Sequence, residues 1–237
     1  MLIDTFKNIF QSAARRKGGD KKLESLLKGE GRGDGGESGN TKSRTQLRAI
    51  PDDRYLAEMT KCIFRSGFVW KIIENKWSGF ETAFNSFDTM SCAMLSDENL
   101  ESLAQDARIV RNAIKIRTVR DNGEFIQRVR KDHQRFSYWI ADWPVSDTVG
   151  LWAALKQGGS RMGGNTSSYF LRFIGKDGFI LSRDVLAALR REGIIEHNRV
   201  PGKKALGQIQ SAFNIWQADS GRSLKEISRT LAYSVES

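Results

Sequence analysis

The sequence predicts an all-α protein, and three observations support this fold class. Apolar residues recur at helical spacing along most of the 237 residues, with breaks at Gly, Asn and Asp. The alternation of apolar and polar residues that is typical of half-buried strands is absent. The chain also contains 3 Pro, which is few for its length.

The chain is strongly basic. It carries 38 Lys and Arg against 28 Asp and Glu, which gives a formal net charge of +10. This balance favours a polyanionic partner, with nucleic acid first and an anionic membrane surface second. The 2 Cys argue against a disulfide scaffold and suit a reducing compartment. No apolar run reaches the roughly 18 residues of a membrane helix, and residues 1–17 do not resemble a signal peptide.

Residues 1–50 are expected to form a flexible basic extension that includes a Gly-rich linker. The apolar positions over residues 2–10 and the segment 21–28 favour two short helices. Residues 29–44 are expected to be the linker, because they offer too little apolar surface to offset the entropy of ordering. The extension either adds non-specific attraction to DNA or is a solvated arm without a set role.

Residues 51–237 are expected to form one helical domain. Asp52 or Asp53 can cap a helix that runs to about Ser66. In the helix expected over residues 112–130, Ile114 is expected to face inward and Lys115 outward. Other helices are expected near residues 70–77, 78–84, from 96 onward, 136–144, 147–156, 167–174, 182–193, 203–219 and 223–235.

The stretch from residue 158 to residue 195 combines two glycine-rich turns with two helix starts. The first turn spans residues 158–166, and the second spans residues 175–178 and precedes a helix capped by Ser182. Amide groups at a helix N-terminus attract phosphate, and glycine lets the backbone come close to it. A contact of this kind holds DNA without reading its sequence. The alternative is an ordinary corner between helices with a basic rim, and the spacing leaves both readings open.

This stretch resembles the helix-hairpin-helix segment of base-excision DNA glycosylases. Residues 163–167, GGNTS, match the glycine hairpin, and residues 175–181, GKDGFIL, match the connection that follows. The resemblance implies an all-α, helix-hairpin-helix glycosylase-like domain. Ser182 takes the position of the superfamily's catalytic aspartate, and Asp184 follows two residues later. Asp184 is therefore either a catalytic carboxylate or a partner of the helix dipole. The residues that the resemblance assigns to DNA binding are Gly163, Gly164, Asn165, Thr166, Ser167, Lys176 and Arg183.

Residues 52–126 resemble the DNA-3-methyladenine glycosylase I family. The order and spacing of the family's motifs are kept in DRYLAEM at 53–59, SGFVW at 66–70, FETAF at 80–84, LAQDA at 103–107 and IVRN at 109–112. Together the two resemblances cover roughly residues 52–195.

Trp70 falls on the position of the family's pocket tryptophan. A base flipped out of DNA is held between flat surfaces, and stacking contributes about 1–3 kcal/mol per base. The alternative for Trp70 is a core aromatic at helical spacing. The family reads the damaged base with a glutamate about eight residues earlier, where this chain has Cys62 or Ile63. Glu58 lies one turn before that place and either substitutes for the glutamate as a catalytic carboxylate or is structural.

The resemblance implies a monofunctional DNA glycosylase of base-excision repair. Its substrate would be an alkylated purine such as 3-methyladenine in double-stranded DNA. We expect a cytoplasmic monomer, associated with the bacterial nucleoid when bound to DNA, with no cofactor and no membrane partner. We expect no metal, because His133 and His197 are the only histidines and no CxxC pair exists. Two alternatives remain, a non-catalytic protein that binds damaged DNA on the same scaffold and a basic helical adaptor acting through its N-terminal segment.

Overall fold

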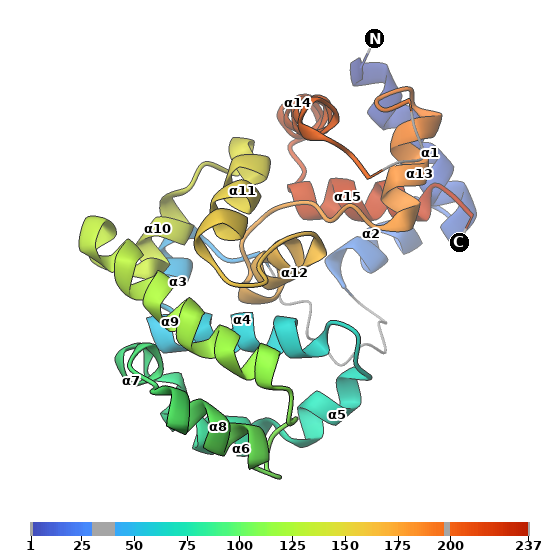
Figure 1. The fold of residues 1–237 in the computed structure, drawn as a ribbon. Helices are drawn as coiled ribbons and strands as arrows, with labels where there is room; N and C mark the ends of the chain where they lie inside the picture. The colour runs from blue at the N-terminus through green and yellow to red at the C-terminus, as the bar shows by residue number, and fades with distance from the viewer. Residues whose placement is uncertain (1, 30–40, 197–199, 237) are drawn as a thin grey trace. The chain divides into compact units, whose positions relative to one another are not determined.

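The computed structural model describes residues 2–29, 41–196 and 200–236 (Figure 1). Within these residues all regular elements are helices, and no strand is present, so the predicted all-α fold class is confirmed. None of the helices in these three ranges is long and apolar enough to cross a membrane. The elements are α1 Leu2–Lys17, α2 Asp20–Lys28, α3 Arg44–Ala49, α4 Asp52–Arg65, α5 Trp70–Asn75, α6 Trp77–Ala83, η1 Asn85–Phe87, α7 Thr89–Ala93, α8 Asp97–Gln105, α9 Ala113–His133, α10 Phe136–Asp142, η2 Val145–Asp147, α11 Thr148–Gly158, α12 Asn165–Ile174, α13 Arg183–Arg191, α14 Lys203–Ser220 and α15 Leu224–Tyr233.

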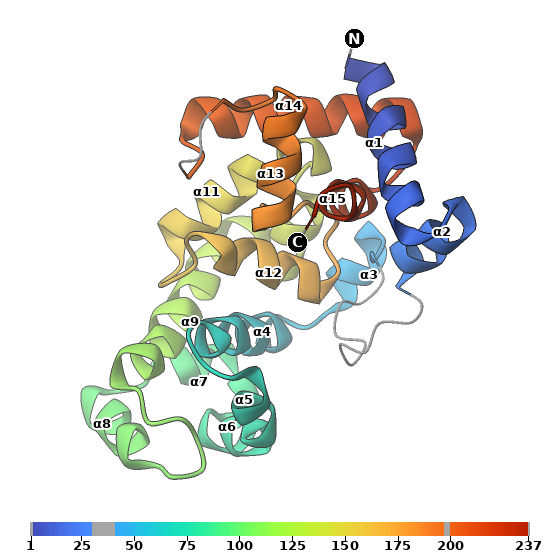
Figure 2. The same ribbon diagram turned by 90° about the vertical axis from the view of Figure 1, so that its right-hand side faces the viewer.

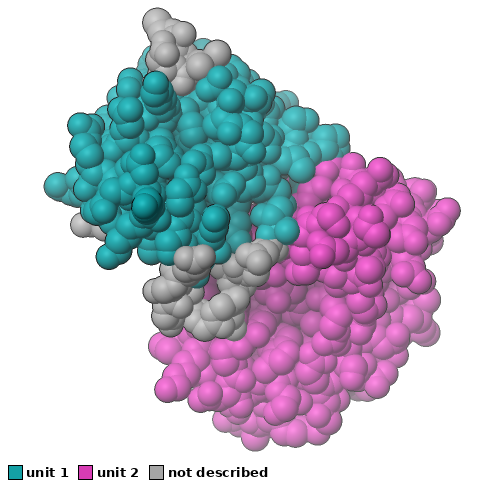
Figure 3. All heavy atoms as spheres, turned by 180° about the vertical axis from the view of Figure 1, so that it is seen from behind, with its two compact units in different colours: residues 1–41, 144–151, 177–237 teal, residues 42–143, 152–176 magenta. Residues whose placement is uncertain are grey.

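The chain folds as two compact units, which Figure 3 colours separately. Unit 1 comprises residues 1–41, 144–151 and 177–237, and unit 2 comprises residues 42–143 and 152–176. This division differs from the expected one at residue 50, because the chain passes from one unit to the other four times.

Helix α9 is the centre of unit 2. It packs against α4, α7, α8 and α10 (Figure 1). Its side chains Ile116, Val119 and Ile126 have no exposed surface. Asn112 caps the helix, and its Oδ1 accepts from the backbone N–H of Lys115 at 3.1 Å. The periodic apolar stripe and the cap together account for the expected helix.

At the start of α9 the side chains that face the core and the solvent are not those expected from the sequence. Ile114 is 67% exposed, whereas Lys115 is buried. The ammonium Nζ of Lys115 donates to the carbonyl oxygens of Phe64 at 3.2 Å and Ser66 at 2.6 Å, at the C-terminal end of α4. Carbonyl groups at the end of a helix have no N–H partner within the helix, so they accept from the ammonium and offset part of the cost of burying its charge. The expected orientation of Ile114 and Lys115 was therefore wrong.

Helix α15 is the centre of unit 1. Its apolar stripe, which includes Leu224, Ile227 and Leu231, is fully buried. Helices α1, α13 and α14 pack around it (Figure 2). Ser223 caps α15 with a capping box formed together with Glu226.

The N-terminal residues are ordered where the structure describes them. The two expected short helices are present as α1 and α2, and both pack against α15. Phe6, Ile9, Leu23 and Leu27 are buried in these contacts. The expectation of a flexible extension therefore does not agree with residues 2–28, because their apolar faces find a partner at the other end of the sequence. Most of the expected Gly-rich linker, residues 30–40, lies outside the described residues.

Candidate functional site

The loop between α11 and α12 is the glycine hairpin that the sequence indicates. Gly164 precedes α12 with φ 59° and ψ −136°, a conformation open to glycine and strained for any other residue. A Cβ on Gly164 would meet no atom within 4 Å, so the space in front of the backbone is open. The loop therefore exposes its backbone at the start of a ten-residue helix.

Helix α9 holds this loop in place. The side-chain amide of Asn122 donates to the carbonyl of Ser160 at 3.1 Å, and its oxygen accepts from the Ser160 N–H at 2.8 Å. Gly158 allows the close packing of α11 on α9, because a Cβ there would lie 2.2 Å from the ring of Phe125. The hydroxyl of Ser167 donates to the carbonyl of Met162 across the loop. The hairpin is thus fixed by contacts of buried side chains before any ligand binds.

A pocket of about 220 Å³ opens beside the hairpin, and all of its lining residues belong to unit 2. It is smaller than the pockets of roughly 300–1,000 Å³ that hold drug-sized ligands, so it suits a ligand as small as one base. Its walls come from the end of α4, the turn before α5, the first residue of α5 and one face of α12. The lining residues are Cys62, Arg65, Ser66, Gly67, Trp70, Asn165, Thr166, Tyr169 and Phe173.

Three aromatic rings surround the pocket. Trp70 stands edge to face against Tyr169, with ring centroids 6.3 Å apart, and against Phe173, with centroids 6.0 Å apart. Trp70 is 44% exposed, so it is not a core residue. An indole that is both exposed and held by neighbouring rings can present a rigid surface for stacking.

Arg65 brings a positive charge into the same pocket. Its side chain is buried, and its guanidinium lies 4.8 Å from the ring centroid of Trp70 and 5.1 Å from that of Phe173. Nε and Nη2 of Arg65 donate to Oε1 of Glu74 at 3.1 and 2.6 Å. Lys61 pairs with the other oxygen of this carboxylate at 2.6 Å. Burial tends to raise the pKa of Glu74, but the hydrogen bonds from Lys61 and Arg65 outweigh it and hold this pKa below its ordinary value.

Cys62, one of the two residues at the place where the resemblance puts a glutamate, lines the pocket. Its Sγ donates to Oε1 of Glu58 at 3.5 Å, one turn earlier on α4. Burial, together with the negative charge of Glu58, raises the pKa of the Cys62 thiol well above its ordinary value. Cys62 therefore stays neutral at pH 7, and Glu58 lies next to the pocket wall rather than in it.

The structure brings only some of the sequence-predicted site residues together. Trp70, Asn165 and Thr166 line the same pocket, and Gly163 and Gly164 precede them in the hairpin. Asp184 and Arg183 lie in unit 1, in the first turn of α13. Ser182 caps that helix as expected, since its Oγ accepts from the Val185 N–H at 3.2 Å.

Two of the residues expected to contact DNA are buried. Lys176 donates through Nζ to the carbonyl oxygens of Ala141 at 3.1 Å and Trp143 at 2.6 Å, at the end of α10. The hydroxyl of Ser167 is used inside the hairpin. These placements do not agree with side-chain contacts of Lys176 and Ser167 to phosphate, because both polar groups serve the fold.

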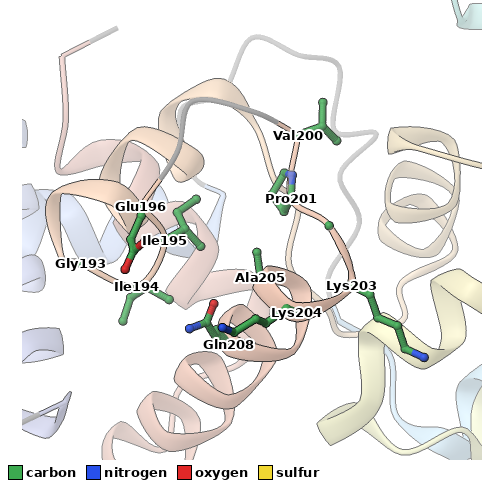
Figure 4. Close-up of a pocket in the computed structure, with 11 residues that line it drawn as sticks. Gly193, Ile194, Ile195, Glu196, Val200, Pro201, Lys203, Lys204, Ala205 and Gln208 are labelled. Atoms are coloured by element: carbon green, nitrogen blue, oxygen red, sulfur yellow. The ribbon is translucent and has the colours of Figure 1, made fainter.

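A larger pocket lies in unit 1, at the turn between α13 and α14 (Figure 4). Ile195 and Pro201 lie on its two sides, and Lys203, Lys204 and Gln208 extend from the start of α14. None of its described lining residues is aromatic. These residues offer no stacking surface like that of Trp70 in unit 2. Over the described residues, no three His, Cys, Asp or Glu side chains form a group that could hold a metal ion.

The sequence did not single out Arg65, Tyr169 or Phe173 as site residues. Arg65 follows three buried residues at the end of α4 and lies five positions before Trp70. The only signal in the sequence is that a basic residue directly follows the apolar run of residues 62–64, and this signal does not distinguish a site residue from a solvent-exposed one.

The sequence matches the model of the methyladenine glycosylase family over residues 48–174, which is more than half of the chain. The matched segment nearly coincides with unit 2, which contains the hairpin and the pocket. None of the curated proteins matches the chain.

Solved structures of two glycosylases are similar to the chain. One is 3-methyladenine DNA glycosylase I from Staphylococcus aureus, determined for its recognition of 3-methyladenine. It is 17% identical with a TM-score of 0.50, over 61% of this chain and 87% of that one. The other is the 8-oxoguanine glycosylase/lyase from Methanocaldococcus jannaschii in complex with DNA. It is 14% identical with a TM-score of 0.49, over 94% of this chain and 95% of that one. At 17% identity, the similarity to the Staphylococcus aureus structure shows the fold alone.

Proposed function

The chain belongs to the methyladenine glycosylase family, and from this membership we propose that it removes an alkylated base from duplex DNA by hydrolysing the N-glycosidic bond. In this reaction the bond between sugar C1′ and the base nitrogen breaks, and the base keeps the electron pair. Water adds its oxygen to C1′ and releases a proton. An alkylated purine such as 3-methyladenine is the first substrate class to examine, because the family carries that name.

The observation that supports this proposal most directly is the aromatic pocket beside the hairpin. A base must leave the DNA stack before an enzyme can act on its glycosidic bond. The exposed ring of Trp70 offers a stacking surface for such a base, and the backbone of Gly163 and Gly164 offers amide groups for a phosphate. The stacking surface of Trp70 and the backbone amides of the hairpin lie side by side, because Asn165 and Thr166 belong to both the pocket and the start of α12.

Glu58 and Asp184 are the two carboxylates proposed for the chemical step. A carboxylate stabilises the positive charge that develops on the sugar as the bond breaks, or it orients the attacking water. Glu58 is the candidate within unit 2, and it accepts from Cys62 in the pocket wall. Asp184 lies in the first turn of α13, where the helix dipole alone also favours a carboxylate.

We propose that the enzyme is monofunctional and leaves the abasic strand intact. A lyase step needs a lysine that forms a Schiff base with the sugar. The ammonium of Lys176 is buried on backbone carbonyls, so it does not offer this nucleophile. Lys156 is exposed on α11 and is the lysine to replace if strand cleavage is observed.

A second candidate function is a protein that binds damaged DNA without turnover. The observation that favours it is the absence of a carboxylate among the residues that line the pocket. Such a protein would hold a flipped base on Trp70 and protect the lesion rather than remove it.

The test uses a set of duplexes that each carry one alkylated base. The set includes 3-methyladenine, 7-methylguanine, 1,N6-ethenoadenine and O6-methylguanine. Release of any free base, with the strand left uncleaved, is the expected result. Binding of a lesion without release would support the second candidate. Equal binding to damaged and undamaged duplexes, without release, would overturn both. The rates of base release of the variants Glu58→Gln and Asp184→Asn identify the carboxylate that takes part in the reaction. The melting temperatures of both variants must equal that of the unchanged protein.

A further inference from the structure

Arg65 at the end of α4 contacts two points of α5 that are one turn apart. Its guanidinium lies 4.8 Å from the ring centroid of Trp70, the first residue of α5. Its Nε and Nη2 donate to Oε1 of Glu74 at 3.1 and 2.6 Å. Residues four positions apart lie on the same face of a helix, so one guanidinium can reach both side chains. The Arg65 side chain is 3% exposed, so its surroundings fix its rotamer.

The local chain does not fix the Trp70 ring by itself. Helix α5 has six residues, and a helix this short is not stable on its own in water. No side chain caps its N-terminus, and the turn before it, residues 66–69, is exposed. Ile73 is the buried residue of α5, so apolar packing anchors the helix at one point. The orientation of the indole therefore depends on contacts from other helices.

Those contacts come from α4 and α12. Tyr169 and Phe173 of α12 stand edge to face against Trp70. The guanidinium of Arg65 lies 5.1 Å from the ring centroid of Phe173 as well, so it bears on both rings. A guanidinium stacks well on aromatic rings, because its planar cation meets their electron-rich faces. Arg65 of α4 thus joins the indole of α5 to α12.

A second cation keeps Glu74 in place. Nζ of Lys61 lies 2.6 Å from Oε2 of Glu74, so each oxygen of this carboxylate has its own cation. The ammonium of Lys61 lies over the ring of Trp77 at 5.2 Å, whereas the guanidinium of Arg65 lies over Trp70. A buried ion pair contributes little net stability, but it can select one conformation. The pair with Glu74 therefore fixes where the guanidinium lies beneath the indole.

From these contacts we propose that Arg65 is a positioning residue, which holds the Trp70 ring in the orientation in which a flipped base stacks. The inference rests on the proposed glycosylase function and adds a residue that acts through Trp70 rather than on the base. Glu74 compensates the charge of the guanidinium, so the role is one of geometry and applies to cationic and uncharged bases alike. A stacking surface that is already fixed lowers the entropy cost of holding the base.

The first experiment follows the indole directly. The protein is labelled with 5-fluorotryptophan, so that each of its 6 Trp gives a fluorine resonance. The Trp70 resonance is the one that the Trp70→Phe protein lacks. Arg65→Gln should shift this resonance and leave the others in place, because Trp70 is the tryptophan against which the guanidinium lies. An unmoved Trp70 resonance in a folded Arg65→Gln protein, or a shift of all the resonances, would overturn the inference.

Two further variants separate contact from charge and from folding. Lys61→Gln removes a positive charge from the same carboxylate, and it should shift the resonance of Trp77 rather than that of Trp70. Equal Trp70 shifts in Lys61→Gln and Arg65→Gln would refute the role of Arg65, because charge alone would then move the resonance.

Glu74→Gln is the variant to use if Arg65→Gln does not fold. It is the milder change, because the Glu74 side chain is 33% exposed. It weakens the hold on the guanidinium, so it should shift the Trp70 resonance while the melting temperature reports on folding. A folded Glu74→Gln protein with an unmoved Trp70 resonance would contradict the inference.

The second experiment measures base release in a double-mutant cycle. If Arg65 acts through Trp70, its replacement matters only while the indole is present. Arg65→Gln should slow base release roughly fivefold or more in the otherwise unchanged protein, and less than about twofold in the Trp70→Ala protein. Equal losses in both proteins would show that Arg65 acts independently of Trp70, and the inference would be wrong.

Failure of this inference can be told apart from failure of the proposed function. The fluorine spectra need no DNA, so they test the hold on Trp70 even if no base is released. Base release with equal losses in the cycle leaves the glycosylase proposal standing and refutes the role of Arg65. A Trp70 shift without any base release supports the hold on the ring and refutes the proposed function. If no base is released and the Trp70 resonance does not respond to Arg65→Gln, both proposals are wrong.

Discussion

Asn122 and Ser160 form a two-way hydrogen-bonded pair between α9 and the hairpin loop. The amide group of Asn122 donates to the Ser160 carbonyl at 3.1 Å, and its oxygen accepts from the Ser160 N–H at 2.8 Å. Asn122 is buried, with 1% of its surface exposed. One side chain thus satisfies both backbone groups of a loop residue and fixes where the following glycines lie.

Replacing Asn122 by Ala should loosen the hairpin. Each buried backbone group left without a partner costs about 1–3 kcal/mol, so the melting temperature should fall clearly. Affinity for duplex DNA should fall by a similar factor for damaged and undamaged sequences, because the hairpin would contact phosphate. Gln127→Ala is the matched control, since it removes an amide on the same helix that donates to Thr89 at 2.9 Å. Unchanged DNA affinity in a folded Asn122→Ala protein would speak against a phosphate grip by this loop.

Gly164 and Gly163 are adjacent, but a side chain should strain the backbone at Gly164 and not at Gly163. Gly164→Ala should be strained by about 1–3 kcal/mol, because its φ of 59° is the left-handed region while no atom lies within 4 Å of the new Cβ. Gly163→Ala should fold normally, because its Cβ would make ordinary contact with Lys156 at 3.5 Å. Thermal unfolding and DNA titration of both variants test this contrast. Equal behaviour of the two variants would show that backbone conformation at Gly164 does not govern the site.

The helices could be predicted from the sequence because their signals are local. The expected helix from Asp52 to about Ser66 is present as α4, Asp52–Arg65, and the cap at Ser182 is formed. The expected aspartate cap of α4 was wrong, because Pro51 is the N-cap and the carboxylate of Asp52 accepts from the backbone N–H groups of Phe136 and Ser137 instead. Lys115 was placed on the wrong face because its carbonyl partners lie about 50 residues away in the sequence. The packing of α1 on α15 depends in the same way on a partner at the far end of the chain.

The site was predictable only in part, for the same physical reason. The glycine hairpin and Trp70 could be found from the resemblance to known glycosylases. Arg65 could not, because its position depends on Glu74 nine residues later and on Phe173 in a distant helix. Lys176 was expected to contact DNA because it is a basic residue beside a glycine turn. In the structure its ammonium is buried against the end of α10.

Asp142 pairs with Arg44 and Arg48 of α3, so the packing of this helix should lose stability at low pH. Hydrogen bonds from Arg44 and then Arg48 hold the pKa of this carboxyl well below its ordinary value. Because the pKa is lower in the folded state, ionisation of Asp142 stabilises the folded protein. This stabilisation is complete above the pKa in the unfolded chain, about 3.9, and is lost as the pH falls through the pKa in the folded protein. About a third of the side chain is exposed, so we expect about 1 kcal/mol at pH 7.

Asp142→Asn should therefore lower the melting temperature by about 2–4 °C at pH 7. The difference from the unchanged protein should begin to shrink below about pH 4. Asp132→Asn, at an exposed position near the end of α9, is the control for removing one negative charge. A difference that stays constant down to pH 2.5 would show that the ion pairs do not stabilise α3.

Trp70→Ala tests the pocket itself. Trp70 is 44% exposed, so its removal should cost less than the roughly 3–5 kcal/mol of a large-to-small change in a packed core. Losing a stacking surface worth about 1–3 kcal/mol should slow base release by roughly five- to over a hundredfold. Affinity for undamaged duplex should hardly change, because phosphates would be held by the hairpin. Ile72→Ala is the matched control, because Ile72 is also 44% exposed, lies on the same helix and does not line the pocket. A Trp70→Ala protein that stays folded and releases base as fast as the Ile72→Ala protein would rule out stacking on this indole.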